Sequence, residues 1–215
     1  MRVKTDERRT AIMAAAWDAF KENGFERTTM SDITDRAGGS KATLYNYFAS
    51  KDELFFETMN HLCEAELEAA YQSIDSATDN IVEALRHFGE RFLSFLYSPT
   101  VMAYRHLSIA ESGRTELGRL LYERGVMPSQ KLVTDFLEAA MSLGRLRQAD
   151  PVLATKHWYA LLESELIDRF LFKLADAIDE AEIKAATARA LEVFMAAYGP
   201  RAPAGLAGEG SPWRP

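Results

Sequence analysis

The polar stretch Lys41–Tyr47 carries the side chains with the clearest chemistry in this 215-residue chain. Leu44 and Phe48 are four residues apart, so they can share the buried face of one helix and leave a cation, a hydroxyl, an amide and two phenols on its free face. The major groove of DNA admits such a helix, and Lys and Asn can read the donors and acceptors on base edges. Hydroxyls and phenols suit phosphate oxygens, which position a protein without carrying sequence information. The alternative is a helical hairpin whose tyrosines only cover a core.

Two short helices separated by a tight turn are predicted to present this surface. Thr29 or Ser31 can accept a backbone N–H at the start of the first helix. Gly38-Gly39 ends that helix, because glycine reaches the left-handed conformations that a sharp turn requires. Ser40 is placed to cap the second helix, which begins at Lys41.

From Phe25 to Phe55 the chain resembles the TetR family of helix-turn-helix regulators. The matching runs occur in the family's order and spacing: Thr28–Ile33, Arg36–Gly38, Ser40–Phe48 and Ser50–Phe55. There are two departures. Gly39 replaces a common valine, which predicts a turn held less rigidly, and Ala42 replaces a frequent glycine at the DNA-facing start of the second helix. The methyl group of Ala42 could contact a thymine methyl group.

The resemblance and the side-chain chemistry together give a predicted set of DNA contacts. We expect Lys41, Ala42 and Asn46 to meet base edges. The hydroxyl, phenol and ammonium groups expected on or beside phosphates are those of Thr29, Ser31, Ser40, Thr43, Tyr45, Tyr47 and Lys51. Lys51 falls in the first turn of the following helix, where the helix dipole disfavours a cation unless an anion approaches.

Composition limits the classes of protein that fit. The chain has 47% apolar and 27% charged residues, enough for a substantial core, and its net charge of −7 excludes a uniformly basic coat. Residues 1–50 carry eight Lys or Arg against seven Asp or Glu, so the negative charge lies in the remainder. A single cysteine, Cys63, excludes an internal disulfide, and no apolar leader or membrane-spanning run is seen. These features predict a cytoplasmic protein.

Helical periodicity continues along the chain and no strand pattern is seen, so the predicted fold is all-α. Residues 1–5 are expected to form a frayed basic arm, and residues 199–215, rich in Gly, Pro and Ala, a disordered tail. The predicted helices are 6–23, the hairpin, 51–74, 79–97, 99–111, 114–143 with a possible kink at 125–128, 151–174 and 179–198. We therefore predict a helix-turn-helix domain at 1–50 and a helical ligand-binding and dimerisation domain at 51–198, connected by the linking helix 51–74.

The last two predicted helices carry apolar residues on more than one side. A helix that is apolar all round needs partners on both sides, so either a large core covers both faces or a second chain covers one of them. The resemblance favours a homodimer joined through these helices. The predicted interface residues are Leu161, Glu165, Arg169, Ala186, Ala190 and Phe194.

The resemblance also implies an apolar cavity in the body, where a small molecule changes the separation of two DNA-binding heads. Aromatic and apolar side chains with a few polar tips suit such a lining. The candidates are Phe88, Phe92, Met102, Tyr104, His106, Trp158 and Leu162, each of which has a core position as its alternative.

Signals for catalysis or metal binding are weak. The four histidines lie in separate segments without ligand spacing, so no metal or cofactor is expected. Glu165 and Arg169 are predicted to form an i,i+4 ion pair. We therefore expect a non-enzymatic homodimer that binds a pseudo-palindromic double-stranded DNA operator as a repressor relieved by an apolar or amphipathic effector. The alternatives are an activator, a ligand-independent regulator or, from another class, a helical carrier or enzyme.

Overall fold

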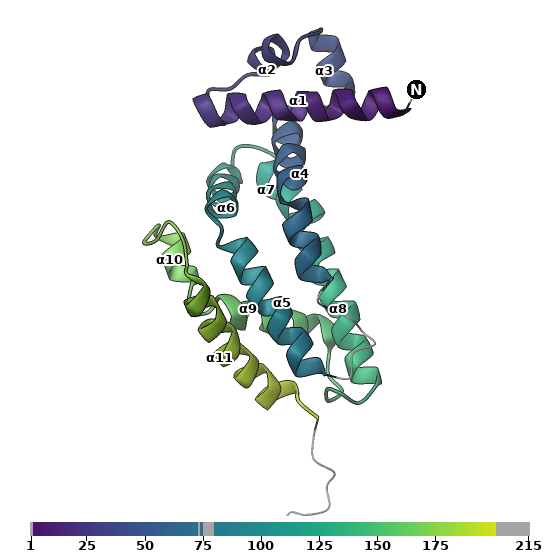
Figure 1. Ribbon diagram of the computed structural model, residues 1–215, viewed down its shortest axis with the longest axis vertical. Helices are drawn as coiled ribbons and strands as arrows, with labels where there is room; N and C mark the ends of the chain where they lie inside the picture. Colours follow the sequence, from purple (N-terminus) through teal and green to yellow (C-terminus); the bar gives the residue numbers. More distant parts are fainter. Residues whose placement is uncertain (1, 73, 75–79, 201–215) are drawn as a thin grey trace, which may run out of the picture.

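The computed structural model describes residues 2–72, 74 and 80–200, and every regular element in this part of the chain is a helix (Figure 1). This confirms the predicted all-α class. The elements are α1 (Arg2–Asn23), α2 (Met30–Ala37), α3 (Lys41–Tyr47), α4 (Lys51–Tyr71), α5 (Ile81–Leu96), α6 (Pro99–Glu111), α7 (Leu117–Leu120), the π-helix η1 (Leu121–Val126), α8 (Met127–Ser142), α9 (Pro151–Glu163), α10 (Ile167–Leu171) and α11 (Glu180–Tyr198). None of the described helices is long and apolar enough to cross a lipid bilayer.

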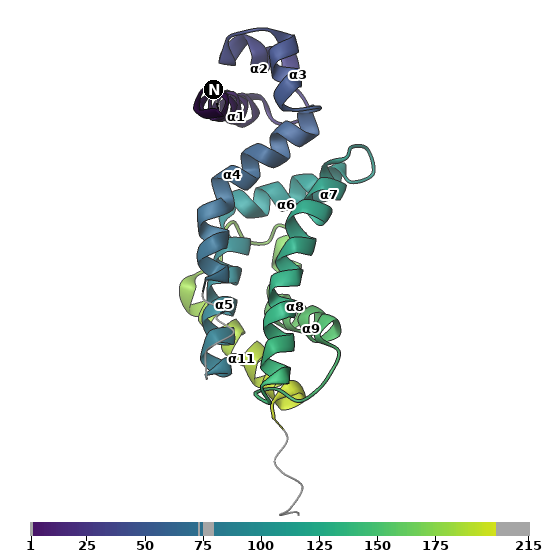
Figure 2. The ribbon, with the colours of Figure 1, turned by 90° about the vertical axis from the view of Figure 1, so that its right-hand side faces the viewer.

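Helices α1, α2 and α3 form a head at one end of the elongated molecule, with α1 lying across the top of the body (Figure 1). Helix α4 starts in the head and continues down into the body, so it belongs to both parts (Figure 2). The apolar core of the head includes Ile12, Phe20 and Leu54, and it continues without interruption to Tyr104 of α6 and Leu117 of α7. The linking helix is therefore packed against the body from its first turns.

Polar caps start most helices where the sequence indicates. Thr29, Ser40 and Ser50 each accept a backbone N–H from the residue three positions later. Ser98, Asp150 and Asp179 similarly cap α6, α9 and α11. The cap predicted at residue 79 lies outside the described residues, and α5 is capped by the side chain of residue 80. The predicted arm at 1–5 is wrong from Arg2 onward, because α1 already begins there. Residues 201–215 of the predicted tail lie outside the described part of the chain.

The helix predicted at 114–143 begins later and contains a π-helical segment that overlaps the predicted kink at 125–128. Helix α7 begins at Leu117, and Leu121–Val126 is wound as the π-helix η1 before α8 continues. Pro128 has no N–H and its ring conflicts with the carbonyl four residues before it. The π-helix η1 ends at Val126, just before this proline, and π-helical turns are often found at functional sites.

The predicted helix 151–174 is broken. Helix α9 ends at Glu163, and α10 follows after a turn in which the Leu166 N–H donates to the Glu163 carbonyl at 2.9 Å. Ser164 contributes to the break because its hydroxyl donates to the Leu161 carbonyl at 2.8 Å, a local bond that competes with the helical ladder. The turn and the start of α10 bury Leu166 and Phe170, each 1% exposed, in the core of the body.

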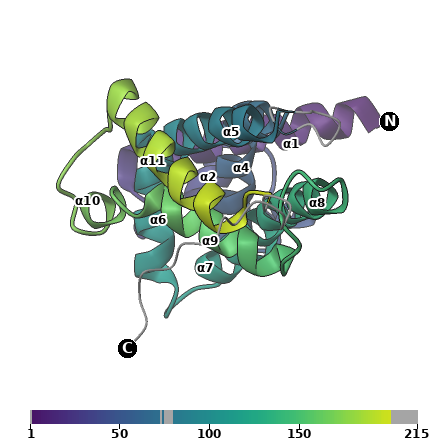
Figure 3. The ribbon, with the colours of Figure 1, turned by 90° about the horizontal axis from the view of Figure 1, so that it is seen from below.

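Helix α11 packs beside α5 and crosses α9, as seen from below in Figure 3. The close approach of α5 depends on Gly89, where a Cβ atom would lie 2.7 Å from Cγ2 of Thr187 in α11. Ala186, Ala190 and Phe194 face this packing and are 3%, 4% and 0% exposed. Their predicted role in a dimer interface is therefore wrong, because they are already buried within their own chain.

Removing the Phe194 ring should therefore destabilise the fold. Phe194→Ala is expected to lower the free energy of unfolding by about 3–5 kcal/mol, since it deletes a fully buried ring that packs on Trp158. Urea denaturation followed by circular dichroism measures this loss. Val82→Ala on the neighbouring helix α5 is the matched control, because Val82 is 42% exposed and should cost far less. Equal costs for the two variants would contradict the assigned orientation of α11.

Candidate nucleic-acid interface and effector cavity

Helix α3 presents the polar face that the sequence predicts. Leu44 and Phe48 are 2% and 1% exposed and belong to the head core. On the free face Lys41, Ala42, Tyr45 and Asn46 are exposed, and Thr43 and Tyr47 are half-buried. The alternative in which the tyrosines cover a core does not fit Tyr45, which is 47% exposed. The head therefore presents a short helix with an exposed cation, amide and phenol, while Tyr47 packs partly against the head core.

Hydroxyl groups at the starts of α2 and α3 stabilise these helices. Ser40 Oγ accepts the Thr43 N–H at 3.0 Å and lies 2.9 Å from the Thr43 hydroxyl. Thr29 donates its hydroxyl hydrogen to Asp32 Oδ2 at 2.8 Å and accepts the Asp32 N–H. Hydrogen bonds from the Thr29 backbone N–H and hydroxyl lower the pKa of Asp32, which keeps that carboxylate charged. Because its hydroxyl is already donated to an anion, Thr29 is poorly suited to the predicted phosphate contact. Ser31 is the second residue of α2 and is half-buried.

Lys51 has a role that the sequence did not reveal. Its Nζ donates to the carbonyl oxygens of Phe25 at 2.8 Å and Glu26 at 3.4 Å, and it lies 4.3 Å from the centre of the Phe25 ring. These contacts offset the unfavourable helix dipole that was the reason for expecting a phosphate partner. The predicted phosphate contact of Lys51 is therefore corrected to a structural contact between the start of α4 and the segment after α1.

Arg8 holds the turn between α2 and α3, a role with no signal in the sequence. Its guanidinium donates to the carbonyl oxygens of Ala37, at 3.1 Å, and Gly38. Gly39 has a φ of 107°, and a Cβ atom there would lie 2.6 Å from Arg8 Nη2. A valine at this position would be strained and would displace the arginine. The expectation of a looser turn at Gly39 is thus wrong, because the missing side chain leaves room for a hydrogen-bonded clamp.

A cavity of about 230 Å³ lies in the body beneath the head. Its walls come from helices α4, α5, α6, α8 and α9 and from η1. The lining residues are Phe56, Met59, Asn60, Cys63, Leu67, Phe92, Phe95, Leu96, Val101, Tyr104, Arg105, Leu121, Gly125, Val126, Ser129, Gln130, Tyr159 and Glu163.

The structure divides the predicted lining residues into three groups. Phe92 and Tyr104 line the cavity. Phe88, Trp158 and Leu162 are 0% exposed and lie in the body core, so their predicted role is wrong. Met102 and His106 line a separate surface groove between α6 and residues 173–176. The residue types alone do not show where packing leaves space.

Arg105 and Glu163 form an ion pair in the cavity lining, with Arg105 Nη2 2.8 Å from Glu163 Oε1. The Tyr97 hydroxyl donates to the same oxygen at 3.0 Å, and burial followed by the Glu163 charge raises the pKa of Tyr97, which keeps this donor protonated. The Arg105 guanidinium also lies over the Phe170 ring at 4.0 Å. The pair thereby connects α6 to α9 and α10.

Cys63 lines the cavity from α4 and is 8% exposed. Burial, and after it the Glu66 charge, raises the pKa of its thiol to about 11. The group therefore remains a protonated thiol near neutral pH. As the single cysteine of the chain, it reports on the cavity without interfering signals.

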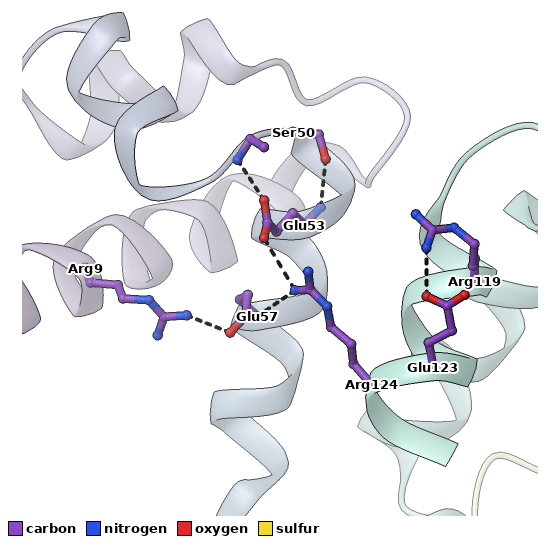
Figure 4. Close-up of polar contacts among 8 residues, drawn as sticks. Arg9, Ser50, Glu53, Glu57, Arg119, Glu123 and Arg124 are labelled. Atoms are coloured by element: carbon purple, nitrogen blue, oxygen red, sulfur yellow. Dashed lines mark hydrogen bonds and ion pairs between the residues drawn. The ribbon is translucent and has the colours of Figure 1, made fainter. Parts of the chain in front are cut away.

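Ion pairs connect the cavity wall to the head (Figure 4). The Glu57 carboxylate of α4 forms ion pairs with Arg9 of α1 at 2.6 Å and with Arg124 of η1 at 3.3 Å. Arg124 also forms an ion pair with Glu53 at 3.4 Å. Glu53 in turn accepts the Ala49 N–H at 2.8 Å, just before α4 begins. Leu121, Gly125 and Val126, from the same π-helix as Arg124, line the cavity. One short segment thus touches both the cavity and the base of the head.

The exposed sides of α9 and α11 carry small and apolar residues. On α9 these are Leu153 and Ala160, and on α11 they are Ala181, Ala185, Ala188 and Ala196. Glu165 pairs with Arg189 at 2.5 Å, and Arg169 pairs with Glu182, so the predicted Glu165–Arg169 pair is wrong. The break after Glu163 separates the two residues of that predicted pair. Leu161 is partly buried against the body core.

The head and the cavity together define a helix-turn-helix DNA-binding protein with a ligand-sized space in its body. Residues 12–58 match the model described as bacterial regulatory proteins, tetR family, and residues 83–200 match the model described as AefR-like transcriptional repressor, C-terminal domain. The chain belongs to the TetR family of transcriptional regulators, as the resemblance in its hairpin indicates, and this family consists of regulators rather than enzymes.

Individual relatives extend this comparison. The transcriptional regulator HbdR of Aromatoleum sp. (strain CIB) is 27% identical over 184 residues, 81% of this chain and 77% of HbdR. The transcriptional activator FasR of Mycolicibacterium smegmatis is 35% identical over 95 residues, 44% of this chain, and the chain spans only 43% of FasR. The solved structure of the flavonoid-responsive regulator FrrA has a TM-score of 0.73 and 32% identity, covering 92% of this chain and 100% of that one.

Proposed function

We propose that the chain is a homodimeric repressor whose release from a pseudo-palindromic operator is controlled by a small apolar or amphipathic effector in the cavity. The observation that carries this proposal is the π-helix η1, which lines the cavity and pairs through Arg124 with the first turns of α4. The match of the body to AefR-like repressors supports repression rather than activation. We expect the protein to act in the cytoplasm, where bacterial DNA lies.

In this proposal each subunit inserts α3 into one major groove, and the two half-sites are spaced by the dimer. Lys41, Ala42 and Asn46 face the bases, and Tyr45, Tyr47 and Thr43 face phosphates. The effector acts by population shift, favouring a separation of the heads that does not match the half-sites. A tenfold loss of operator affinity requires a difference of about 1.4 kcal/mol between the two forms of the protein.

Two variants of α3 should distinguish base reading from phosphate contact by their different effects on DNA binding. Asn46→Ala is expected to relax the preference at one position of each half-site, at a cost of about 1–3 kcal/mol for the preferred base. Tyr45→Phe loses one hydroxyl and should weaken binding to all sequences alike by about 0.5–1.5 kcal/mol. Selection of bound fragments from random DNA, followed by titration of the selected sites, measures both effects. An unaltered base preference in Asn46→Ala would remove this residue from the readout.

The dimer is proposed to form through the exposed sides of α9 and α11, because their alanines allow helices of two chains to approach closely. Ala188→Arg places a long charged side chain in the middle of this surface and should give a monomer in sedimentation equilibrium. Ala65→Arg, on the exposed side of α4, is the matched control and should remain a dimer. A dimer of Ala188→Arg as stable as the parent would mean that the interface lies elsewhere.

The coupling between head and cavity is testable without knowing the effector, because coupling between two sites is reciprocal. Binding of operator DNA to the head should slow amide hydrogen exchange in η1 of the parent protein. Arg124→Met should reduce this response at least severalfold, since it removes the contacts with Glu53 and Glu57. Arg119→Met is the control, because Arg119 pairs with Glu116 and Glu123 and forms no ion pair with α4 among the described residues. The same response in all three proteins would contradict transmission through Arg124.

A further inference from the structure

The charge balance of the cavity points to a specific class of ligand. We infer that the cavity binds a small uncharged molecule with one aromatic ring and a hydroxyl group, of the phenol type, with the hydroxyl placed at Arg105 and Glu163. This inference rests on the proposed function, in which the cavity is the effector site.

The size of the cavity limits the ligand to about one ring with a short substituent. Its volume of about 230 Å³ lies below the roughly 300–1,000 Å³ of pockets that hold drug-sized molecules. It exceeds the roughly 150 Å³ that suffices for benzene in an apolar cavity. The walls favour a ring, because most of them are aromatic and aliphatic side chains such as Phe56, Phe92, Phe95 and Val101.

The lining contains two charged residues in the part of the chain that the structure describes, Arg105 and Glu163, and they neutralise each other. A ligand carboxylate beside Arg105 would also face Glu163, and the two like charges would repel each other. A ligand ammonium group would face Arg105 in the same way. The pair therefore disfavours ions of either sign and favours an uncharged polar group.

The hydrogen-bonding pattern of the pair selects a hydroxyl among uncharged groups. Both described contacts of the Glu163 carboxylate, from Arg105 and from Tyr97, use Oε1, which leaves Oε2 to accept a hydrogen bond. Nη1 of Arg105 is buried and has no hydrogen-bond partner among the described residues. A phenolic hydroxyl both donates and accepts, so it can serve Glu163 and Arg105 together. A hydrocarbon would leave these groups unsatisfied.

Three probes with the same ring and chain test the inference on the full-length protein: 4-propylphenol, 4-propylbenzoate and propylbenzene. Near neutral pH the phenol is uncharged and the benzoate is ionised. Calorimetric titration gives the affinities, and protection of Cys63 from N-ethylmaleimide locates binding in the cavity. We expect the phenol to bind at least tenfold more tightly than the benzoate and severalfold more tightly than propylbenzene, and to slow labelling of Cys63.

A charge variant makes the test sharper. Glu163→Gln leaves Arg105 unopposed, so the order of the two polar probes should reverse in favour of 4-propylbenzoate. Glu165→Gln is the matched control, because Glu165 pairs with the exposed Arg189 outside the cavity and the parent order should persist. The melting temperature of each variant without probe verifies that it folds. Tighter benzoate binding in the parent protein, equal binding of all three probes or binding of none would overturn the inference.

The failure of this inference can be distinguished from failure of the proposed function. A mobility-shift assay with selected operator DNA, performed without any probe, reports on DNA binding alone. If the shift occurs and the phenol does not bind, the ligand class is wrong and the regulator stands. If the phenol binds and no duplex is shifted at low salt, the cavity assignment stands and the proposed regulator fails.

Discussion

The carboxylate of Glu57 connects the head to the body, because it forms ion pairs with Arg9 of the head and with Arg124 of η1, which lines the cavity. All three side chains are partly exposed to solvent, and such ion pairs contribute only about 0–1 kcal/mol each. The connection is therefore weak enough to be rearranged by a ligand. A tenfold change in operator affinity needs about 1.4 kcal/mol, which is of the same order. A stronger junction would hold the head in one position irrespective of the cavity.

Apolar packing sets the limits within which this junction works. The head core extends from α1 to Tyr104 and Leu117, so the head is not a separate body on a flexible linker. Movement of α4 must therefore repack aromatic contacts such as that between Phe55 and Tyr104, whose ring centres are 5.7 Å apart. Tyr104 also lines the cavity. The residue that joins the head core to the body is thus one that a ligand would touch.

The sequence was sufficient for features determined by neighbours along the chain. The caps at Ser40 and Asp150 and the burial of Leu44 follow from local hydrogen bonding and helical spacing. The sequence was insufficient for contacts and burial that depend on segments distant along the chain. The partners of Lys51 are carbonyls about 25 residues away, and the burial of Phe194 depends on α5 and α9. Periodicity identifies the apolar face of a helix, but not whether its own chain or a second chain covers that face.

The ion pair between Arg105 and Glu163 extends the argument from the cavity to the dimer. Glu163 is the last residue of α9, the helix whose outer side is proposed to meet a second chain, and Arg105 packs on Phe170 of α10. In the inferred binding mode, a ligand hydroxyl bonded to this pair would act on α9 as well as on α6. In the proposed function, the same ligand would act at two places: the junction at Glu57 within each chain and the helix at the proposed interface between chains.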